Sequence, residues 1–154
     1  MSDDASLRGD CSRCIGLCCV ALAFDRGPHF AIDKPAGIPC RHLDASAACA
    51  IHARLEQSGF AGCDAYDCRG AGQLATALFP GLDWRDGPVV ARQLFAAFGR
   101  LRQIQLMRVL AADHPAWSAR LDPAEGWSLE TLLTLDLVAL ERELAELLAA
   151  PAAV

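Results

Sequence analysis

Hydrophobic residues recur at helical spacing only in the second half of the chain. Residues 71–79 predict a short helix, which Pro80-Gly81 would end. The next helix is expected to begin at the capping residue Asp86, to carry Pro88 in its first turn, and to end before His114-Pro115. Its apolar positions alternate steps of four and three: Val90, Leu94, Ala97, Leu101 and Ile104. Such a stripe is typical of a helix that packs against other helices.

The last helix is predicted from about Ser128 to the residues just before Pro151. One of its faces carries the leucines Leu129, Leu133, Leu137, Leu140, Leu144 and Leu147. Ahead of it, Asp122-Pro123-Ala124-Glu125 has the form of a capping box that opens a short turn. We interpret the leucine stripe as core packing rather than as a surface for a partner.

The first half of the chain lacks such periodicity, because glycine and proline interrupt it repeatedly. Only short elements fit there: an extended segment over Val20–Phe24, and a short helix from Cys49 to Ser58 that Gly59 stops. The predicted fold is therefore mainly α-helical. An irregular, cysteine-rich, metal-stapled module (residues 11–70) is expected to pack on about three helices of a helical segment (residues 71–150).

Composition and charge narrow the class of protein. The chain has 154 residues, of which 53% are hydrophobic, so it can bury a core. A net charge of −5 disfavours a nucleic-acid partner, which would need a basic surface. No apolar run is long enough to span a membrane, and the acidic start Met1-Ser2-Asp3-Asp4 is unlike a secretory signal. We therefore expect a cytoplasmic protein.

All eight cysteines lie in the first 68 residues: Cys11, Cys14, Cys18, Cys19, Cys40, Cys49, Cys63 and Cys68. A two-residue gap, as between Cys11 and Cys14, is the usual spacing of thiolates that bind one zinc ion or an iron–sulfur cluster. Cytosolic thiols stay reduced, which favours metal ligands over disulfides. The sequence therefore predicts that all eight are metal ligands.

The ligands after the opening cluster come in pairs. Cys40 is followed by His42, Cys49 by His52 and Cys63 by Cys68, so His52 and His42 are further candidate ligands. Both histidines also suit other roles, His52 as a second-shell or capping group and His42 as a solvated turn residue. The set fits two four-ligand sites or one site with spare thiols. Adjacent side chains diverge, so Cys18 and Cys19 are expected to belong to two sites, unless one of them is structural.

The ordered motifs resemble a bacterial cysteine-cluster family, the putative zinc- or iron-chelating domain (CxxCxxCC, YkgJ-like). The resemblance rests on Cys11-x2-Cys14-x3-Cys18-Cys19, Pro39-Cys40-Arg41-His42-Leu43, Cys49-Ala50-Ile51-His52, Cys63 and Cys68. Two departures are a third residue before the double cysteine, and Gly59-Phe60-Ala61-Gly62 where the family usually has Arg-Pro before the next cysteine. The stretch from Gly37 to Gln73 looks closest to the module found ahead of some pentapeptide-repeat proteins. The resemblance implies metal binding.

Three functions follow as hypotheses. The first is a metal-binding protein whose ion, zinc before an iron–sulfur cluster, is structural or regulatory. The second is an iron–sulfur protein in redox, sensing or enzyme-accessory chemistry, and the third is a thiol redox switch. The sequence holds no phosphate-binding glycine loop, nucleophile elbow or His-Glu-x-x-His helix, so no catalytic residue is assigned. The helical segment is a candidate docking platform for an unknown protein partner.

Overall fold

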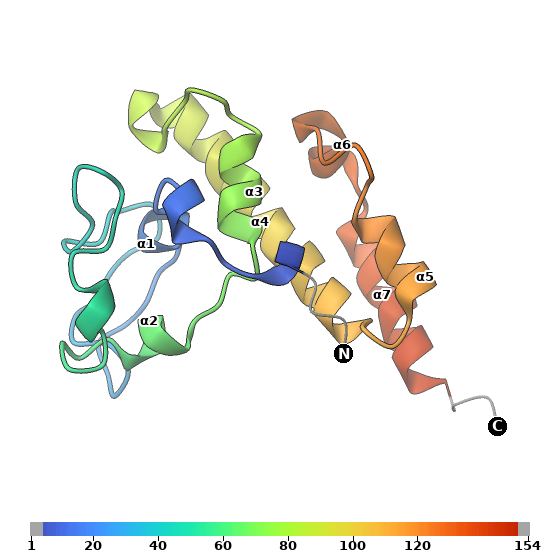
Figure 1. Cartoon of the computed structure of the whole chain (residues 1–154), viewed down its shortest axis with the longest axis horizontal. Helices are drawn as coiled ribbons and strands as arrows, with labels where there is room; N and C mark the ends of the chain where they lie inside the picture. Colours follow the sequence, from blue (N-terminus) through green and yellow to red (C-terminus); the bar gives the residue numbers. More distant parts are fainter. Residues whose placement is uncertain (1–4, 151–154) are drawn as a thin grey trace.

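A single long helix, α4 (Pro88–Leu110), lies between the cysteine-rich segment and the C-terminal helices (Figure 1). The computed structural model describes residues 5–150, which contain seven α-helices, five short 3₁₀ segments and no β-strand. The mainly helical fold predicted from the sequence is confirmed. The other helices are α1 (Leu17–Ala21), α2 (Ala61–Ala65), α3 (Ala71–Ala77), α5 (Pro115–Ser118), α6 (Leu129–Thr134) and α7 (Leu137–Ala149). Five α-helices thus follow residue 70, more than the three expected.

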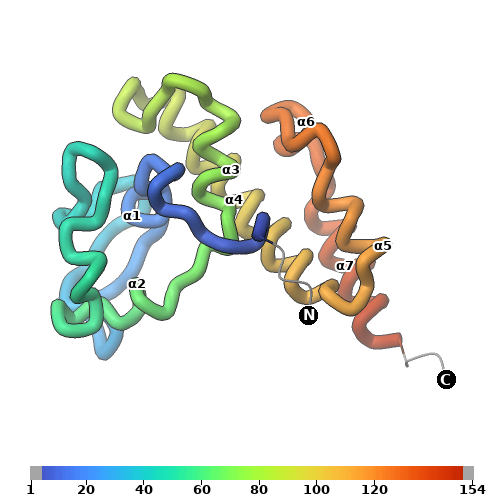
Figure 2. Tube along the Cα trace, in the orientation of Figure 1, coloured from blue at the N-terminus to red at the C-terminus, as the bar shows by residue number. Residues whose placement is uncertain are grey.

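The predicted stripe of α4 forms the centre of the main core. Leu94, Ala97, Leu101 and Ile104 are fully buried, and Phe98 joins them at 1% exposure. Helix α3 and the 3₁₀ segment Trp84–Asp86 pack on the same helix, as do α6 and α7. Helix α4 therefore lies between α3 on one side and α6 and α7 on the other (Figure 2).

The start of α4 differs from the prediction. Gly87 occupies the N-cap position. Asp86 does not cap the helix: its carboxylate accepts a hydrogen bond from the backbone N–H of Asp83 (2.6 Å) and closes the preceding 3₁₀ segment. Asp122, predicted to open a capping box, instead pairs with Arg108 at 2.9 Å. In both cases the carboxylate that was predicted to cap a helix instead binds another polar group nearby, the N–H of Asp83 or the guanidinium of Arg108.

The predicted C-terminal helix is two helices. Ser128 caps α6 as expected, but Leu135 is extended and Asp136 starts α7 by accepting a hydrogen bond from the N–H of Ala139 (3.0 Å). The Arg100 guanidinium of α4 donates to the carbonyls of Leu132 and Leu135, so the C-terminal carbonyls of α6 are satisfied where the break occurs. Leu133, one residue of the predicted stripe, is consequently exposed.

The segment from residue 22 to residue 60 is irregular, as predicted, although its elements differ in detail. Helix α1 already contains Val20, so the expected extended segment begins only at Leu22. The predicted helix over Cys49–Ser58 is a 3₁₀ turn, His52–Arg54, followed by further turns. Isolated β-bridges join distant positions: Phe24 with Lys34, Gly27 with Phe30, and Leu43 with Cys49.

The buried hydrophobic residues form two separate clusters. The main core combines Leu17 of α1 with buried residues of α3, α4, α6 and α7. The smaller cluster contains only Ile51, Leu55 and Phe60 as buried residues. None of the helices described is long and apolar enough to cross a membrane. The irregular segment thus has a small apolar cluster of its own, to which the half-buried Phe24, Phe30 and Ile32 also contribute.

Candidate functional site

Four cysteines lie around one small cavity at the junction of the N-terminal loop, α1 and α3. We call Cys11, Cys14, Cys18 and Cys68 the first thiol group. The cavity has a volume of about 20 Å³, close to the space of one water molecule. Its remaining walls come from Asp10, Gly72, Gln73 and Phe98. A cavity of this size can accommodate one small ion but no organic ligand.

The loop that carries Cys11 is held against α3 by polar contacts. Asp10 accepts hydrogen bonds from the backbone N–H (3.0 Å) and hydroxyl (2.6 Å) of Ser12 and so caps the 3₁₀ turn Cys11–Arg13. The buried side chain of Gln73 accepts from the N–H of Asp10 (3.0 Å) and donates to the carbonyl of Arg8 (2.7 Å). Gln73 therefore fixes the position of this loop relative to α3.

Cys14 and Cys18 are positioned by the turn into α1. The N–H of Ile15 donates to the Thr76 hydroxyl (3.3 Å), and the indole of Trp84 donates to the carbonyl of Ile15 (3.0 Å). Gly16 has a φ of +73°, a conformation that favours glycine, and the chain then enters α1. Cys14 and Cys18, which precede and follow this turn in the sequence, both line the cavity.

Gly72 leaves room for the sulfurs. It lies in α3, four residues after Cys68, and a Cβ atom built on it would lie 2.8 Å from the Sγ of Cys14 and 3.7 Å from the Sγ of Cys68. Any side chain at this position would enter the space between two thiols. The absence of a side chain is thus a structural requirement of the first thiol group.

The other four cysteines come from α1, α2 and the segment between these helices. We call Cys19, Cys40, Cys49 and Cys63 the second thiol group. The backbone N–H of Cys40 donates to the carbonyl of Cys19 (2.9 Å). Cys49 pairs with Leu43 in a β-bridge, and both Cys49 and Cys63 pack against the small cluster of Ile51, Leu55 and Phe60. Chain segments separated by more than forty positions thus meet in this group.

The adjacent cysteines connect the two groups. The Sγ atoms of Cys18 and Cys19 lie 3.9 Å apart, which is within hydrogen-bond distance for sulfur. This hydrogen bond lowers the pKa of the Cys18 thiol to about 7 and raises the pKa of Cys19. The thiols of Cys18 and Cys19 therefore interact directly, although the two residues are assigned to different groups.

Burial and neighbouring thiols act on the other cysteines. Burial raises the pKa of Cys63 to about 11, and the thiols of Cys40, Cys18 and Cys49 add to this shift. Burial also raises the pKa of Cys11, with contributions from the other three members of its group. The sulfurs are therefore close enough to interact electrostatically within each set and, through Cys18, between the two sets. All eight cysteines are free thiols.

Lys34 lies beside the second thiol group. Its side chain is only 4% exposed, and its ammonium donates to three carbonyls: Val20 (3.0 Å), Pro35 (3.1 Å) and Ile38 (2.8 Å). Burial lowers the pKa of Lys34, and the thiols of Cys40 and Cys19 oppose that shift. The buried ammonium is thus close enough to thiols of both groups to interact with them electrostatically.

The two candidate histidines lie at the edge of this region. The His42 ring packs edge-on against Phe60, with centroids 5.1 Å apart, and His52 is exposed on its 3₁₀ turn. Within residues 5–150, no group of three or more His, Cys, Asp or Glu side chains is arranged to hold a metal ion as it stands. Ligation would therefore require thiol side chains to turn inward.

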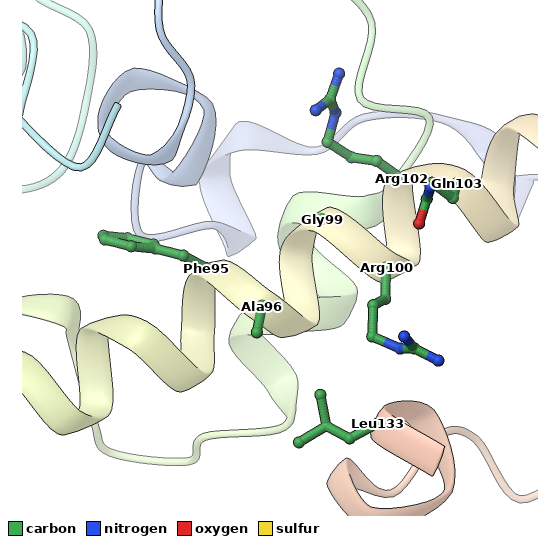
Figure 3. Close-up of a pocket in the computed structure, with 7 residues that line it drawn as sticks. All are labelled: Phe95, Ala96, Gly99, Arg100, Arg102, Gln103 and Leu133. Carbon is green, nitrogen blue, oxygen red and sulfur yellow. The ribbon is translucent and has the colours of Figure 1, made fainter. Parts of the chain in front are cut away.

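A larger hollow lies elsewhere, along the outer face of α4 toward α6. It is an open groove of about 600 Å³ that includes Ala96, Gly99, Arg100 and Leu133 (Figure 3). Arg100 points from α4 toward α6, where its guanidinium is engaged by backbone carbonyls. No cysteine lines this groove. It carries no chemistry related to the thiols.

Sequence reasoning proposed the eight cysteines as ligands, which stays a prediction, and it missed the residues that surround them. Lys34 is the only lysine of the chain beside thirteen arginines, which was the available signal. Gly72 belongs to the run Gly70-Ala71-Gly72-Gln73, where glycine within a predicted helix was a second signal. Gln73 offered no signal, because its role depends on a loop more than sixty residues earlier.

Comparison with known proteins gives one informative similarity. The chain is 45% identical over 102 residues to the uncharacterized protein YybG of Bacillus subtilis (strain 168). The match covers 66% of this chain but only 37% of that protein. No family model matches the chain, and no solved structure resembles it significantly.

Proposed function

We propose that the chain is a metal-binding protein that holds a single ion, zinc in preference to an iron–sulfur cluster, in its first thiol group. The observation that carries this proposal is the cavity of about 20 Å³ framed by Cys11, Cys14, Cys18 and Cys68. Four sulfur donors are the ligand set typical of structural zinc sites. We also propose membership of the YkgJ-like cysteine-cluster family, on the motifs described above.

The size of the cavity supports a single ion. An iron–sulfur cluster with several iron and sulfide ions needs much more space than one water molecule occupies. A Cβ atom on Gly72 would already lie 2.8 Å from the Sγ of Cys14, so α3 and the loop are closely packed at this point. A mononuclear site thus fits the packing, whereas a cluster would require α3 to move away from the loop.

A metal ion would stabilise the irregular segment, whose hydrophobic cluster is small. The irregular segment has only three buried hydrophobic residues in its own cluster, Ile51, Leu55 and Phe60. In such small domains, metal binding and folding are coupled. The four cysteines would be deprotonated ligands, and Gln73 and Asp10 would keep the loop in place for them. The role is structural or regulatory, with no catalytic step assigned.

The test is metal analysis of anaerobically purified protein, with zinc, iron and acid-labile sulfide measured beside the visible spectrum. We expect colourless protein that contains zinc, and a loss of zinc in Cys14→Ser. Arg13→Ala is the matched control, because Arg13 is exposed in the same turn and does not line the cavity. Protein without metal, in which all eight thiols react with a thiol reagent, would overturn the proposal. Brown protein that contains iron and sulfide would show that the bound cofactor is an iron–sulfur cluster and not zinc.

A thiol redox switch is the second candidate, favoured by the pair Cys18 and Cys19. Their sulfurs are 3.9 Å apart, and the lowered pKa of Cys18 favours the reactive thiolate. Oxidation by hydrogen peroxide would form an S–S bond and reduce the peroxide to two molecules of water. Metal-free protein in which this disulfide forms reversibly would favour the switch over the metal site.

A further inference from the structure

We infer that the open groove between α4 and α6 is a docking site for an acidic amphipathic helix of a partner protein. The groove is the hollow of about 600 Å³ described above. No cysteine lines it, so this inference does not depend on metal binding. Its lining combines apolar side chains with two guanidinium groups, and each of these features indicates one property of the occupant.

The surface of α4 forms the floor of the groove at Gly99. A Cβ atom built on Gly99 meets no atom within 4 Å, so the space above the helix backbone is open at this point. Phe95 and Arg102 project from one side of α4, whereas Arg100 points to the other side, toward Leu133 (Figure 3). A rod-shaped partner that lies between these two pairs of side chains can therefore approach the backbone of α4 closely.

The exposed apolar face of α4 continues beyond the groove toward the end of the helix. Leu106 and Leu110 are 49% and 51% exposed, although leucine is usually buried. They follow Gly99 by seven and eleven residues, and these positions lie on one face of an α-helix. At 1.5 Å per residue, this face spans roughly 16 Å from Gly99 to Leu110. That length suits about three turns of a bound helix, which uses side chains spaced three or four residues apart to fill a groove.

The charge of the groove indicates an acidic occupant. The charged residues that line it are Arg100 and Arg102, and within residues 5–150 neither forms an ion pair with a carboxylate. Arg100 donates to the carbonyl of Leu132 (2.7 Å). The guanidinium carbon of Arg102 lies 5.5 Å from the ring centroid of Tyr66 and 5.8 Å from that of Phe98. Carbonyls and rings thus position the two guanidiniums without neutralising them, and carboxylates of a partner would supply the opposite charge.

A carboxylate of the chain itself reaches the edge of the groove. Glu141 of α7 accepts a hydrogen bond from the side-chain amide of Gln103, with the two atoms 3.5 Å apart. This carboxylate binds a neutral amide and leaves both arginines of the groove unpaired. The acidic side chains of the partner are therefore expected at the arginines rather than at the side that faces α7.

A second copy of the chain fits this face poorly. If two α4 helices packed antiparallel around Gly99, a two-fold axis would bring Arg100 and Arg102 close to the same arginines of the other copy. Like charges brought together in an interface oppose association. A nucleic acid is disfavoured by the net charge of −5, because it requires a basic surface. The lining therefore suits a protein segment that carries both apolar and acidic side chains.

The probe is a synthetic helical peptide of about 18 residues, or five turns, with leucine at steps of three and four and glutamate on its other face. A second peptide has the same leucines and lysine in place of every glutamate. Fluorescence anisotropy measures the binding of each labelled peptide to the full-length chain. We expect the glutamate peptide to bind at least about tenfold more tightly, with an affinity that falls as salt is added. The net charge of −5 favours the lysine peptide at other sites, so this preference would identify a local cationic groove.

Matched variants locate the binding in the groove. Ala96→Glu adds a carboxylate to the lining and should weaken binding of the glutamate peptide at least about tenfold. Gln93→Glu is the control, because Gln93 is exposed on the same helix and does not line the groove. Arg102→Gln should reduce the preference for glutamate over lysine, whereas Arg92→Gln, which removes an exposed charge outside the groove, should not. Circular dichroism checks folding, and Gly99→Glu replaces Ala96→Glu if that variant is unfolded, because a Cβ atom at Gly99 also meets open space.

Several results would overturn the inference. These are equal binding of the two peptides, binding of neither, or equal weakening by Ala96→Glu and Gln93→Glu. Sedimentation velocity of the chain without peptide should show a monomer. A wild-type dimer that Ala96→Glu dissociates would assign the face to a second copy and overturn the acidic partner. These results do not depend on metal content, so the inference and the proposed function can fail separately.

Discussion

Replacing Gly72 by alanine adds one methyl group between the sulfurs of the first thiol group. The new Cβ atom would lie 2.8 Å from the Sγ of Cys14, well inside ordinary contact distance, and 3.7 Å from the Sγ of Cys68. Gly99 in α4 is the matched control. A Cβ atom there meets no atom within 4 Å, because Gly99 borders the open groove of Figure 3.

The magnitude follows from two opposing contributions. Glycine to alanine inside a helix stabilises the folded state by about 1 kcal/mol, and this gain applies to both positions. Adding a methyl group to a packed site costs about 1–3 kcal/mol, and this cost applies only to Gly72. The free energy of unfolding should therefore rise by about 1 kcal/mol in Gly99→Ala. Gly72→Ala should be about 1–3 kcal/mol less stable than that control.

The assay is urea unfolding of the wild type, Gly72→Ala and Gly99→Ala, with a chelator and again with zinc. Zinc should stabilise Gly99→Ala as much as the wild type and Gly72→Ala less, because the methyl group occupies space beside the ligands. Zinc counting should show one ion fewer in Gly72→Ala. If Gly72→Ala were as stable as Gly99→Ala and bound as much zinc, the assignment of the cavity would be refuted.

Two further predictions concern packing and pH. Phe98→Ala should lower the free energy of unfolding by about 3–5 kcal/mol, because the Phe98 side chain is only 1% exposed. Urea unfolding measures this change, and a loss below about 1 kcal/mol would contradict the assigned core. In chelator-treated protein, the raised pKa of Cys63 means that the folded chain keeps a proton that the unfolded chain releases above its ordinary pKa of 9.0. This contribution to stability is complete below pH 9 and lost as pH rises toward 11, so the stability difference between wild type and Cys63→Ser should shrink over that interval. A difference that stays constant would contradict the shift.

The helices were predictable where their own residues determine them. The stripe from Leu94 to Ile104 is buried as its spacing indicates, because a single helix face needs only local periodicity. The break before Asp136 was missed, since it depends on Arg100, a residue of another helix that binds the carbonyls at the end of α6. Prediction thus failed where a distant side chain replaces a local hydrogen bond.

The cysteines were predictable as ligand candidates from spacing alone, but their grouping was not. Cys68 joins Cys11 because α3 packs on the N-terminal loop through Gln73, and Cys40 joins Cys19 through one backbone hydrogen bond. Neither contact has a signature in the local sequence. The expectation that Cys18 and Cys19 divide between two sites depended only on the geometry of adjacent residues, and it stays a prediction until metal is counted.

Native mass spectrometry of the intact, anaerobically purified chain tests the central claim most directly, because it reports both the identity and the number of bound ions. Comparison with the denatured mass should show one zinc ion per chain and no sulfide. A native mass equal to that of the bare polypeptide, with eight thiols open to alkylation, would contradict the account.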